Sequence, residues 1–302
     1  MGNPQTGIFA IGTSAHAYLE FSRLPGVDAL SAVTAIATLE EPHTTVGGVN
    51  IVVGVAAGLW AQVAPEATPV GFRDFTDPLV GPDGYTMPAT QRCFWIWLAG
   101  SSRDSVFDVA HGVIDALRTF ATVTQYDEGW DYHHGRDLIG FIDGTENPSL
   151  LEAPGVALIE RGLPGANGSI VLVQRWVHDR TAWNALSDTA QERVVGRTKA
   201  ESVELDEESM PEDSHVARTV VEVDGVEQEI FRRNTPIGDL GASGTIFIGF
   251  CKSQDLLHTM LERMIGADGG PRDALTRYTT ATSGAYYFCP SAEDLGRFRT
   301  AE

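Results

Sequence analysis

The sequence has little positive charge. Its 302 residues include 21 Lys and Arg against 41 Asp and Glu, which gives a formal net charge of −20. A field of this sign repels the phosphate backbone of nucleic acids and the anionic surface of membranes. Neither is therefore expected as a partner, although acidity by itself assigns no function.

Cysteine is also scarce. Cys93, Cys251 and Cys289 form no CxxC pair, and the first two lie in apolar, strand-like runs. We expect all three to be buried, reduced thiols, as in a reducing compartment. The first residues lack the basic segment and long apolar core of a signal peptide, and no apolar run is long enough to cross a bilayer. A cytoplasmic location is the resulting expectation.

The common nucleotide, hydrolase and metal motifs are absent as well. There is no Walker loop, no G-x-S-x-G elbow, no HExxH and no EF-hand pattern. The glycines of GLPGANG (162–168) precede a predicted strand instead of following one, so we do not expect nucleotide binding there.

What the sequence does contain is a repeated strand-then-helix unit. An apolar run followed by a pattern of helical period occurs at 7–40, 92–120, 169–187 and 245–266. A Ser or Asp near each junction can cap the helix. Further strands are predicted at 49–55 and 284–290.

Each half of the chain therefore fits a β-α-β-β-α-β pattern. We predict an α+β fold of two tandem ferredoxin-like subdomains, with antiparallel sheets, flanking helices and a dimeric α+β barrel-like arrangement. One domain, 1–302, would consist of an N-terminal half, 1–148, and a C-terminal half, 149–302. The alternative is a doubly wound parallel sheet, but long gaps at 56–91 and 196–244 interrupt the alternation that such a sheet needs.

One carboxylate stands out in LIGFIDGTENP, residues 138–148. Asp143 follows a run rich in apolar residues and precedes Gly144. An acid carried towards the core loses solvation. It requires compensation from an arginine, from backbone N–H groups or by remaining protonated.

A histidine and an arginine form a second candidate group. His215 leaves the acidic segment 201–214 and enters a stretch whose valines indicate packed structure. Arg232 and Arg233 follow after VDGVEQ, which is typical of a turn between two strands. On pattern alone, an edge hairpin with ordinary surface arginines is the better interpretation.

Together with Asp143, however, a functional site becomes the better interpretation. Peroxide chemistry needs an acid that accepts and returns a proton, and a cation that stabilises charge on the departing oxygen. A histidine that ligates haem iron would supply the metal from the other side.

These three segments resemble those of the dye-decolorizing peroxidase (DyP) family. GFIDGTENP at 140–148 resembles the family's GxxDG signature, with Asp143 as its acid. HVART at 215–219 is similar to the proximal-histidine segment, and FRRNTPIG at 231–238 is similar to the distal-arginine segment. The compact form of the chain is most similar to the cytosolic bacterial branch of the family (class B, YfeX-like).

The resemblance implies a haem b (iron protoporphyrin IX) in the C-terminal half. His215 would be the axial ligand of the haem iron. Asp143 and Arg232 would lie on the opposite, distal side as catalytic residues, with Arg232 also in contact with the cofactor. Asn234 would help to position distal water or peroxide.

Further contacts with the cofactor are implied for neighbouring residues. Arg218 would bind a haem propionate, and Gly144 and Thr145 would approach the porphyrin edge, where a Cβ at Gly144 would clash. Asp273 is the candidate carboxylate to accept the other N–H of His215. Arg233 is expected to face away from the site, because successive residues of a strand point to opposite sides.

The implied activity is oxidation of dyes, phenols or other one-electron donors by hydrogen peroxide through a ferryl-oxo intermediate. A homo-oligomer is expected, and a surface Trp or Tyr would relay electrons from bulky donors. The chain lacks the long tail that directs some relatives into encapsulin compartments, so encapsulation is not expected. Two alternatives remain open: a haem-binding deferrochelatase that releases iron from haem, and a haem-free ferredoxin-like protein that binds a small ligand.

Overall fold

The computed structural model describes residues 2–39, 48–239 and 241–299. The strands of the N-terminal half are β1 (Ala15–Arg23), β2 (Val49–Val55), β3 (Leu79–Val80), β4 (Thr86–Met87), β5 (Phe94–Gly100) and β6 (Ala121–Trp130). Those of the C-terminal half are β7 (Ser169–His178), β8 (Val221–Val223), β9 (Val226–Gln228), β10 (Phe231–Arg232), β11 (Thr235–Gly238), β12 (Ser243–Cys251), β13 (Thr279–Ala281) and β14 (Ala285–Cys289).

Short and medium helices connect these strands. The α-helices are α1 (Ala29–Ala37), α2 (Ala57–Val63), α3 (Arg103–Leu117), α4 (Ala153–Ala157), α5 (Arg180–Asn184), α6 (Asp188–Val195), α7 (His215–Thr219), α8 (Gln254–Met264) and α9 (Ala292–Gly296). Single 3-10 turns lie at Thr6–Phe9, Pro65–Ala67 and Ala274–Arg277.

The main sheet closes into a barrel. Its strand order is β10-β12-β11-β6-β1-β5-β2-β14-β7-β13, and an additional pairing of β12 with β7, each the strand next to one end of this order, closes the sheet. Every pairing of named strands within the described residues is antiparallel. The predicted α+β class and barrel-like arrangement are confirmed, and the doubly wound alternative is wrong.

Each half contributes one ferredoxin-like set of strands. In the N-terminal half the spatial order is β6-β1-β5-β2, and in the C-terminal half it is β14-β7-β12-β11. Both orders place the fourth strand beside the first and the third beside the second, as expected for a β-α-β-β-α-β unit. The division of the chain at residues 148 and 149 stays a prediction.

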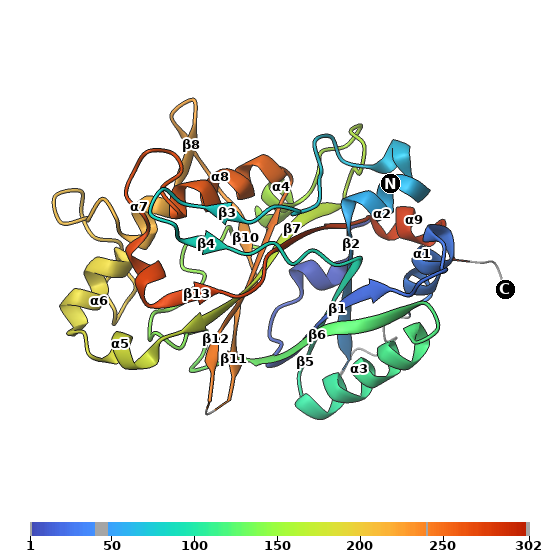
Figure 1. The fold of residues 1–302 in the computed structure, drawn as a ribbon, viewed down its shortest axis with the longest axis horizontal. Helices are drawn as coiled ribbons and strands as arrows, with labels where there is room; N and C mark the ends of the chain where they lie inside the picture. Colours follow the sequence, from blue (N-terminus) through green and yellow to red (C-terminus); the bar gives the residue numbers. More distant parts are fainter. Residues whose placement is uncertain (1, 40–47, 240, 300–302) are drawn as a thin grey trace.

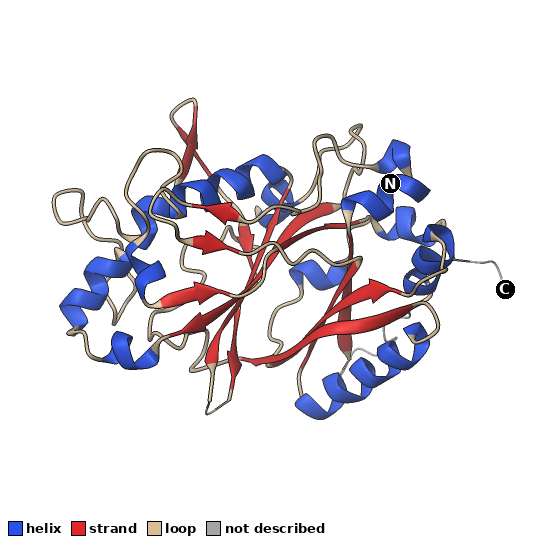
Figure 2. Cartoon of the chain, in the orientation of Figure 1, coloured by secondary structure: helices blue, strands red, loops and turns tan. Residues whose placement is uncertain are grey.

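Strands β2, β5 and β14 are nearly continuous apolar runs because both of their faces are buried. Along β5, Trp95 and Trp97 point into the barrel, whereas Phe94, Ile96 and Leu98 pack towards the helices outside it. Such two-sided burial removes the polar alternation that a strand with one solvated face would show. Figures 1 and 2 show the strands crossing the middle of the molecule, with helices on both sides.

The helices begin where the sequence predicts capping residues. The side chains of Asp28, Ser102, Asp179 and Ser253 accept backbone N–H bonds at the starts of α1, α3, α5 and α8. An acceptor at this position satisfies one of the N–H groups that a helix leaves unpaired. The predicted strand-then-helix units are therefore confirmed. Helices α5 to α8 lie at the left and upper left of Figure 1, around the cavity described below.

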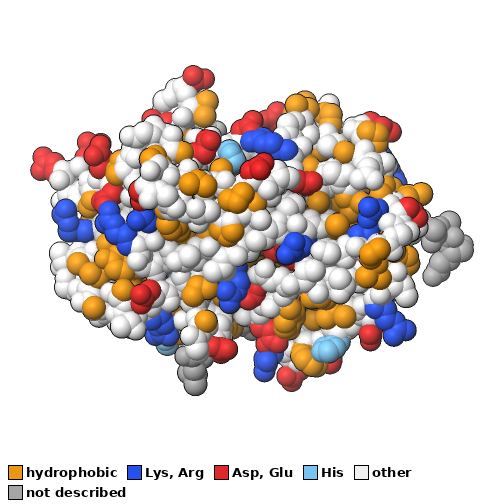
Figure 3. Space-filling model, viewed as in Figure 1, with side chains coloured by type: hydrophobic (Ala, Val, Ile, Leu, Met, Phe, Trp, Pro, Cys, Tyr) orange, Lys and Arg blue, Asp and Glu red, His pale blue; other side chains and the backbone are white. Residues whose placement is uncertain are grey.

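The surface carries acidic, basic and apolar side chains side by side, as Figure 3 shows for one face. The acidic segment 201–214 is largely exposed, as predicted, although Ser202 and Ser214 within it are buried. The three cysteines are free, as predicted. Cys251 and Cys289 are buried, but Cys93 is partly exposed, so the prediction of burial is wrong for Cys93. Within the described residues, the search for a helix long and apolar enough to cross a bilayer finds none.

Candidate active site

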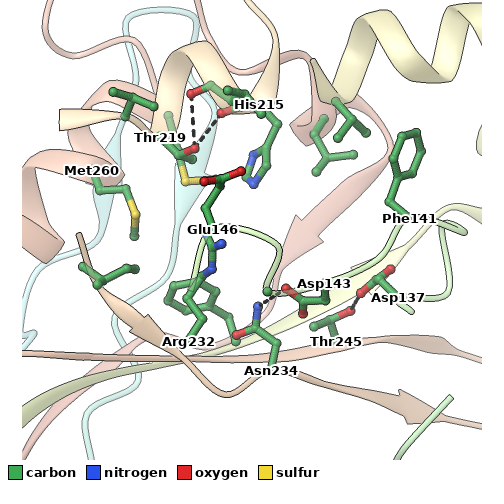
Figure 4. Close-up of a pocket in the computed structure, with 18 of the residues that line it drawn as sticks. Asp137, Phe141, Asp143, Glu146, His215, Thr219, Arg232, Asn234, Thr245 and Met260 are labelled. Carbon is green, nitrogen blue, oxygen red and sulfur yellow. Dashed lines mark hydrogen bonds between the residues drawn. The ribbon is translucent and has the colours of Figure 1, made fainter. Parts of the chain in front are cut away.

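A cavity of about 430 Å³ lies between the loop that carries Asp143 and helix α7. Strands β7, β10 and β12 and helix α8 supply further walls. Figure 4 shows His215 on one side of this space and Asp143, Arg232 and Asn234 on the other. The structure therefore brings together residues that are up to 91 positions apart in the sequence.

His215 is held by a buried carboxylate. It is the first residue of α7, which is capped by the Ser214 hydroxyl accepting the Ala217 N–H. Nδ1 of His215 lies 2.7 Å from Oδ2 of Asp273, which has no exposed surface. The predicted contact is confirmed. If Nδ1 carries the proton and donates it to Asp273, the lone pair of Nε2 is free to bind a ligand in the cavity.

Asp143 faces the cavity from the opposite side. Nδ2 of Asn234 donates to Oδ1 of Asp143 at 3.3 Å, and Oδ1 of Asn234 accepts the Ile248 N–H at 3.0 Å. Asp143 is partly buried and lines the cavity. This burial raises its pKa, the nearby guanidinium of Arg232 opposes the rise, and the charge of Asp137 adds to it.

The two adjacent arginines point in opposite directions. Arg232 lines the cavity, and its buried Nε has no hydrogen-bond partner in the described part of the chain. The guanidinium of Arg233 instead donates to the carbonyls of Ile8 and Ala10 and lies 5.0 Å from the ring centre of Trp97, inside the barrel. The prediction that Arg233 faces away is confirmed.

Two features of the loop fix its conformation. Gly144 has a φ of +78°, a left-handed backbone that favours glycine, and a Cβ there would lie 3.2 Å from the amide of Asn147. Nδ2 of Asn147 donates to the Arg232 carbonyl at 2.8 Å, and its Oδ1 accepts the Arg232 N–H at 2.9 Å. Asn147 thus ties the Asp143 loop directly to β10. Thr145, between them, also lines the cavity.

The structure does not bring Arg218 to the cavity, contrary to the expectation for a propionate-binding residue. Its guanidinium is buried outside the cavity, where it donates to the Arg263 carbonyl and pairs with Asp268. The end of α8 offers unpaired carbonyl oxygens, and these attract a nearby cation. Arg197 lines the cavity instead, paired with Glu146 at 2.9 Å and Glu204 at 2.8 Å.

Sequence reasoning also missed Asp137 and His178, which line the cavity near Asp143. Asp137 accepts a hydrogen bond from the Thr245 hydroxyl, and its Oδ1 lies 3.8 Å from Nδ1 of His178. The position of Asp137, six residues before Asp143, was the available signal. Nothing in the sequence pointed to His178 or to Arg197.

Comparison with known proteins agrees with this geometry. Residues 134–294 match the family model described as Dyp-type peroxidase, C-terminal. A dye-decolorizing peroxidase of Mycobacterium tuberculosis is 33% identical over 275 residues, which cover 89% of this chain and 81% of the relative.

Solved structures are similar over nearly the whole chain. DyPB from Rhodococcus jostii RHA1 is 35% identical, with a TM-score of 0.90 and coverage of 97% of both chains. A variant of that protein in complex with heme has a TM-score of 0.89 at 34% identity and covers 96% of this chain and 97% of its own. Because the family model spans more than half of the sequence and the curated relative most of it, the chain belongs to the Dyp-type peroxidase family.

Proposed function

We propose that this chain is a haem peroxidase in which His215 binds the haem iron and Asp143 and Arg232 act on hydrogen peroxide from the opposite side. The proposal depends on one observation: a single cavity lies between two different sets of polar side chains. A carboxylate-held imidazole lies on one side, and an acid, a cation and an amide lie on the other.

The residues around the cavity fit a haem. Phe247, Met260 and Leu275 provide apolar walls for a flat macrocycle. Nε2 of His215 has no hydrogen-bond partner among the described residues and can ligate iron, and the guanidinium of Arg197 can face the negative propionates. When bound, the haem supplies the iron at which the O–O bond of the peroxide is cleaved and two oxidising equivalents are held.

The chain's own residues move the protons and stabilise the charge. An ionised Asp143 accepts a proton from hydrogen peroxide and returns it to the departing oxygen, which leaves as water. The guanidinium of Arg232 faces the negative charge that develops on that oxygen. Asn234 fixes the orientation of the carboxyl through its 3.3 Å contact.

We assign the chain to the compact class B branch, a proposal supported by its likeness to DyPB over 97% of both chains. The reducing substrate is a one-electron donor such as a phenol or a dye. Free cysteines support a reducing, cytoplasmic location. A homo-oligomer is part of the proposal, and light scattering of the purified protein would test it.

The test uses haem-loaded protein. Wild type should show a Soret band that changes rapidly on mixing with hydrogen peroxide, and it should oxidise a phenolic donor. His215→Ala should lose the ligated-haem spectrum, whereas His111→Ala, on the exposed face of α3, should retain it. Release of iron with intact metal-free porphyrin, without donor oxidation, would contradict the proposal and support a deferrochelatase.

A further inference from the structure

The loop that carries Asp143 is bound by hydrogen bonds and an ion pair to a second segment, distant in the sequence, which we call the 197–204 turn. Nη1 of Arg136 donates to the Gly140 carbonyl at 2.7 Å within the loop, and Nη2 donates to the Ala200 carbonyl in the turn at 2.9 Å. At the other end, Arg197 of the turn pairs with Glu146 of the loop. Two arginines, one from each segment, therefore bridge the same pair of segments.

The two segments also approach each other closely between these bridges. Gly140 has a φ of +98°, and a Cβ placed there would lie 3.0 Å from Cε of Lys199. Lys199 is in turn fixed, because its ammonium pairs with Asp188 at 2.7 Å and its N–H donates to Glu192 at 3.0 Å. The turn is thus supported by α6 and forms a firm surface for the loop.

Ser202 lies at the centre of this contact. Its hydroxyl accepts the N–H of Ile142, the residue before Asp143, at 2.9 Å, and its carbonyl accepts a bond from Arg197 at 2.8 Å. Ser202 is 2% exposed and has a φ of +54°, which is unusual for a residue other than glycine, asparagine or aspartate. A strained backbone of this kind persists only where the surrounding structure holds it, and it is frequent next to functional sites.

We propose that Ser202 is a positioning residue for Asp143: its hydroxyl holds the Ile142 N–H and thereby keeps the Asp143 carboxyl in its enclosed place beside Arg232. Ser202 does not line the cavity, so it acts only through the loop. The inference rests on the proposed function, because it concerns the acid that the function assigns to proton transfer.

Loss of the hydrogen bond between Ser202 and the Ile142 N–H would lower the pKa of Asp143. The charged groups that face Asp143 are Arg232 and Asp137, and burial is the largest cause of its raised pKa. A loosened loop admits water to the carboxyl, which stabilises its charged form and moves its pKa back towards the ordinary range. The reaction with peroxide requires the ionised acid. Its full rate would therefore be retained down to a lower pH.

The experiment compares haem-loaded wild type with Ser202→Ala and Ser202→Gly. Both variants lack the hydroxyl, but glycine tolerates the left-handed backbone and should cost less thermal stability than alanine. Ser102→Ala is the matched control, because it removes a serine hydroxyl that accepts a backbone N–H at the start of α3, in the other half of the chain. Two readouts are taken: hydrogen exchange of peptides covering residues 138–147, and the pH dependence of the peroxide reaction in stopped flow.

We expect both Ser202 variants to speed hydrogen exchange of the Ile142 N–H roughly tenfold. We also expect the acid limb of the pH profile, which is the fall in the peroxide rate at low pH, to move to lower pH. Ser102→Ala should change neither. The positioning role would be overturned if the Ser202 variants exchanged at the wild-type rate. It would also be overturned if they exchanged faster but the acid limb stayed at the wild-type pH.

Asp143→Asn, measured alongside, separates the two ideas. If it abolishes the acid limb while both Ser202 variants keep the wild-type limb, the positioning role is wrong and the proposed function stands. If Asp143→Asn itself keeps the limb, the proton-transfer role that the proposed function gives to Asp143 fails, and the positioning role fails with it.

Discussion

Nδ1 of His215 lies 2.7 Å from Oδ2 of Asp273, and Asp273 has no solvent-exposed surface. The carboxylate accepts the Leu275 N–H through its other oxygen at 2.8 Å, so its orientation is fixed independently of the histidine. A full negative charge held at this distance makes the imidazole a stronger electron donor to a bound metal.

Asp273→Asn keeps the size of this partner and removes its charge. We expect the reduction potential of the haem iron to rise and the reaction with peroxide to slow by about 10- to 100-fold, because the imidazole donates less electron density. Spectroelectrochemical titration measures the first effect and stopped flow the second. Asp268→Asn, which affects the pair with Arg218 instead, is the control; an equal shift in both variants would exclude a specific role for Asp273.

Arg232→Leu should slow the reaction with peroxide by about 10²- to 10³-fold, because a cation facing the departing oxygen is lost. Haem content should not change. Arg233→Leu provides the contrast, since Arg233 is bound to the carbonyls of Ile8 and Ala10 and to Trp97. That variant should lower the melting temperature but retain the peroxide rate, and equal slowing by both variants would contradict the assignment.

Asn147→Ala removes both hydrogen bonds between the Asp143 loop and β10 and leaves the N–H and carbonyl of Arg232 without these partners. We expect a loss of about 1–3 kcal/mol in the free energy of unfolding, together with a slower peroxide reaction. Urea titration and stopped flow measure the two effects. Asn50→Ala, which removes one amide contact with the Ala99 carbonyl in the other half, should affect stability alone.

His16 gives a prediction of pH-dependent stability away from the cavity. Burial, with a smaller effect of Arg233, lowers the pKa of His16 from 6.5 to about 4. The neutral ring suits its neighbours, because Nδ1 accepts from Trp97 Nε1 at 3.2 Å. The unfolded chain therefore binds the proton more readily than the folded chain between pH 6.5 and 4.

The stability that depends on neutral His16 is complete above pH 6.5 and is lost as the pH falls towards 4, by about 3 kcal/mol. His16→Gln should remove this part of the acid destabilisation. Urea unfolding at a series of pH values, compared between the two proteins, measures the difference. Parallel pH dependences for the wild type and the variant would show that His16 does not cause it.

The sequence was sufficient to predict the antiparallel α+β class and to single out residues that the structure brings to one cavity. Asp143 could be identified because a carboxylate is rare after a strongly apolar run. The roles of Arg232 and Asn234 came from the resemblance to the family, and strand alternation served only to choose Arg232 over Arg233. The His215–Asp273 contact was predicted from the general need of a ligating imidazole for an acceptor on its other nitrogen.

Other parts of the site depend on long-range packing that no local pattern records. Arg218 was assigned to the cofactor because it follows His215 by three residues, but the carbonyls at the end of α8 and the Asp268 carboxylate bind it elsewhere. The role of Asn147 depends on bonds to Arg232 that span 85 positions. Ser202 gave no signal, because it lies in an acidic segment whose other residues are mostly exposed.

The alternation along β10 makes the site sensitive to the length of this short segment. Phe231 and Arg233 belong to the barrel interior, whereas Arg232 and Asn234 belong to the cavity. Insertion or deletion of a single residue just before Phe231 would exchange the two sides. It would direct Arg233 to the cavity and force Arg232 into the barrel. Substitutions at many positions of this hairpin should therefore be tolerated more easily than any change in its length.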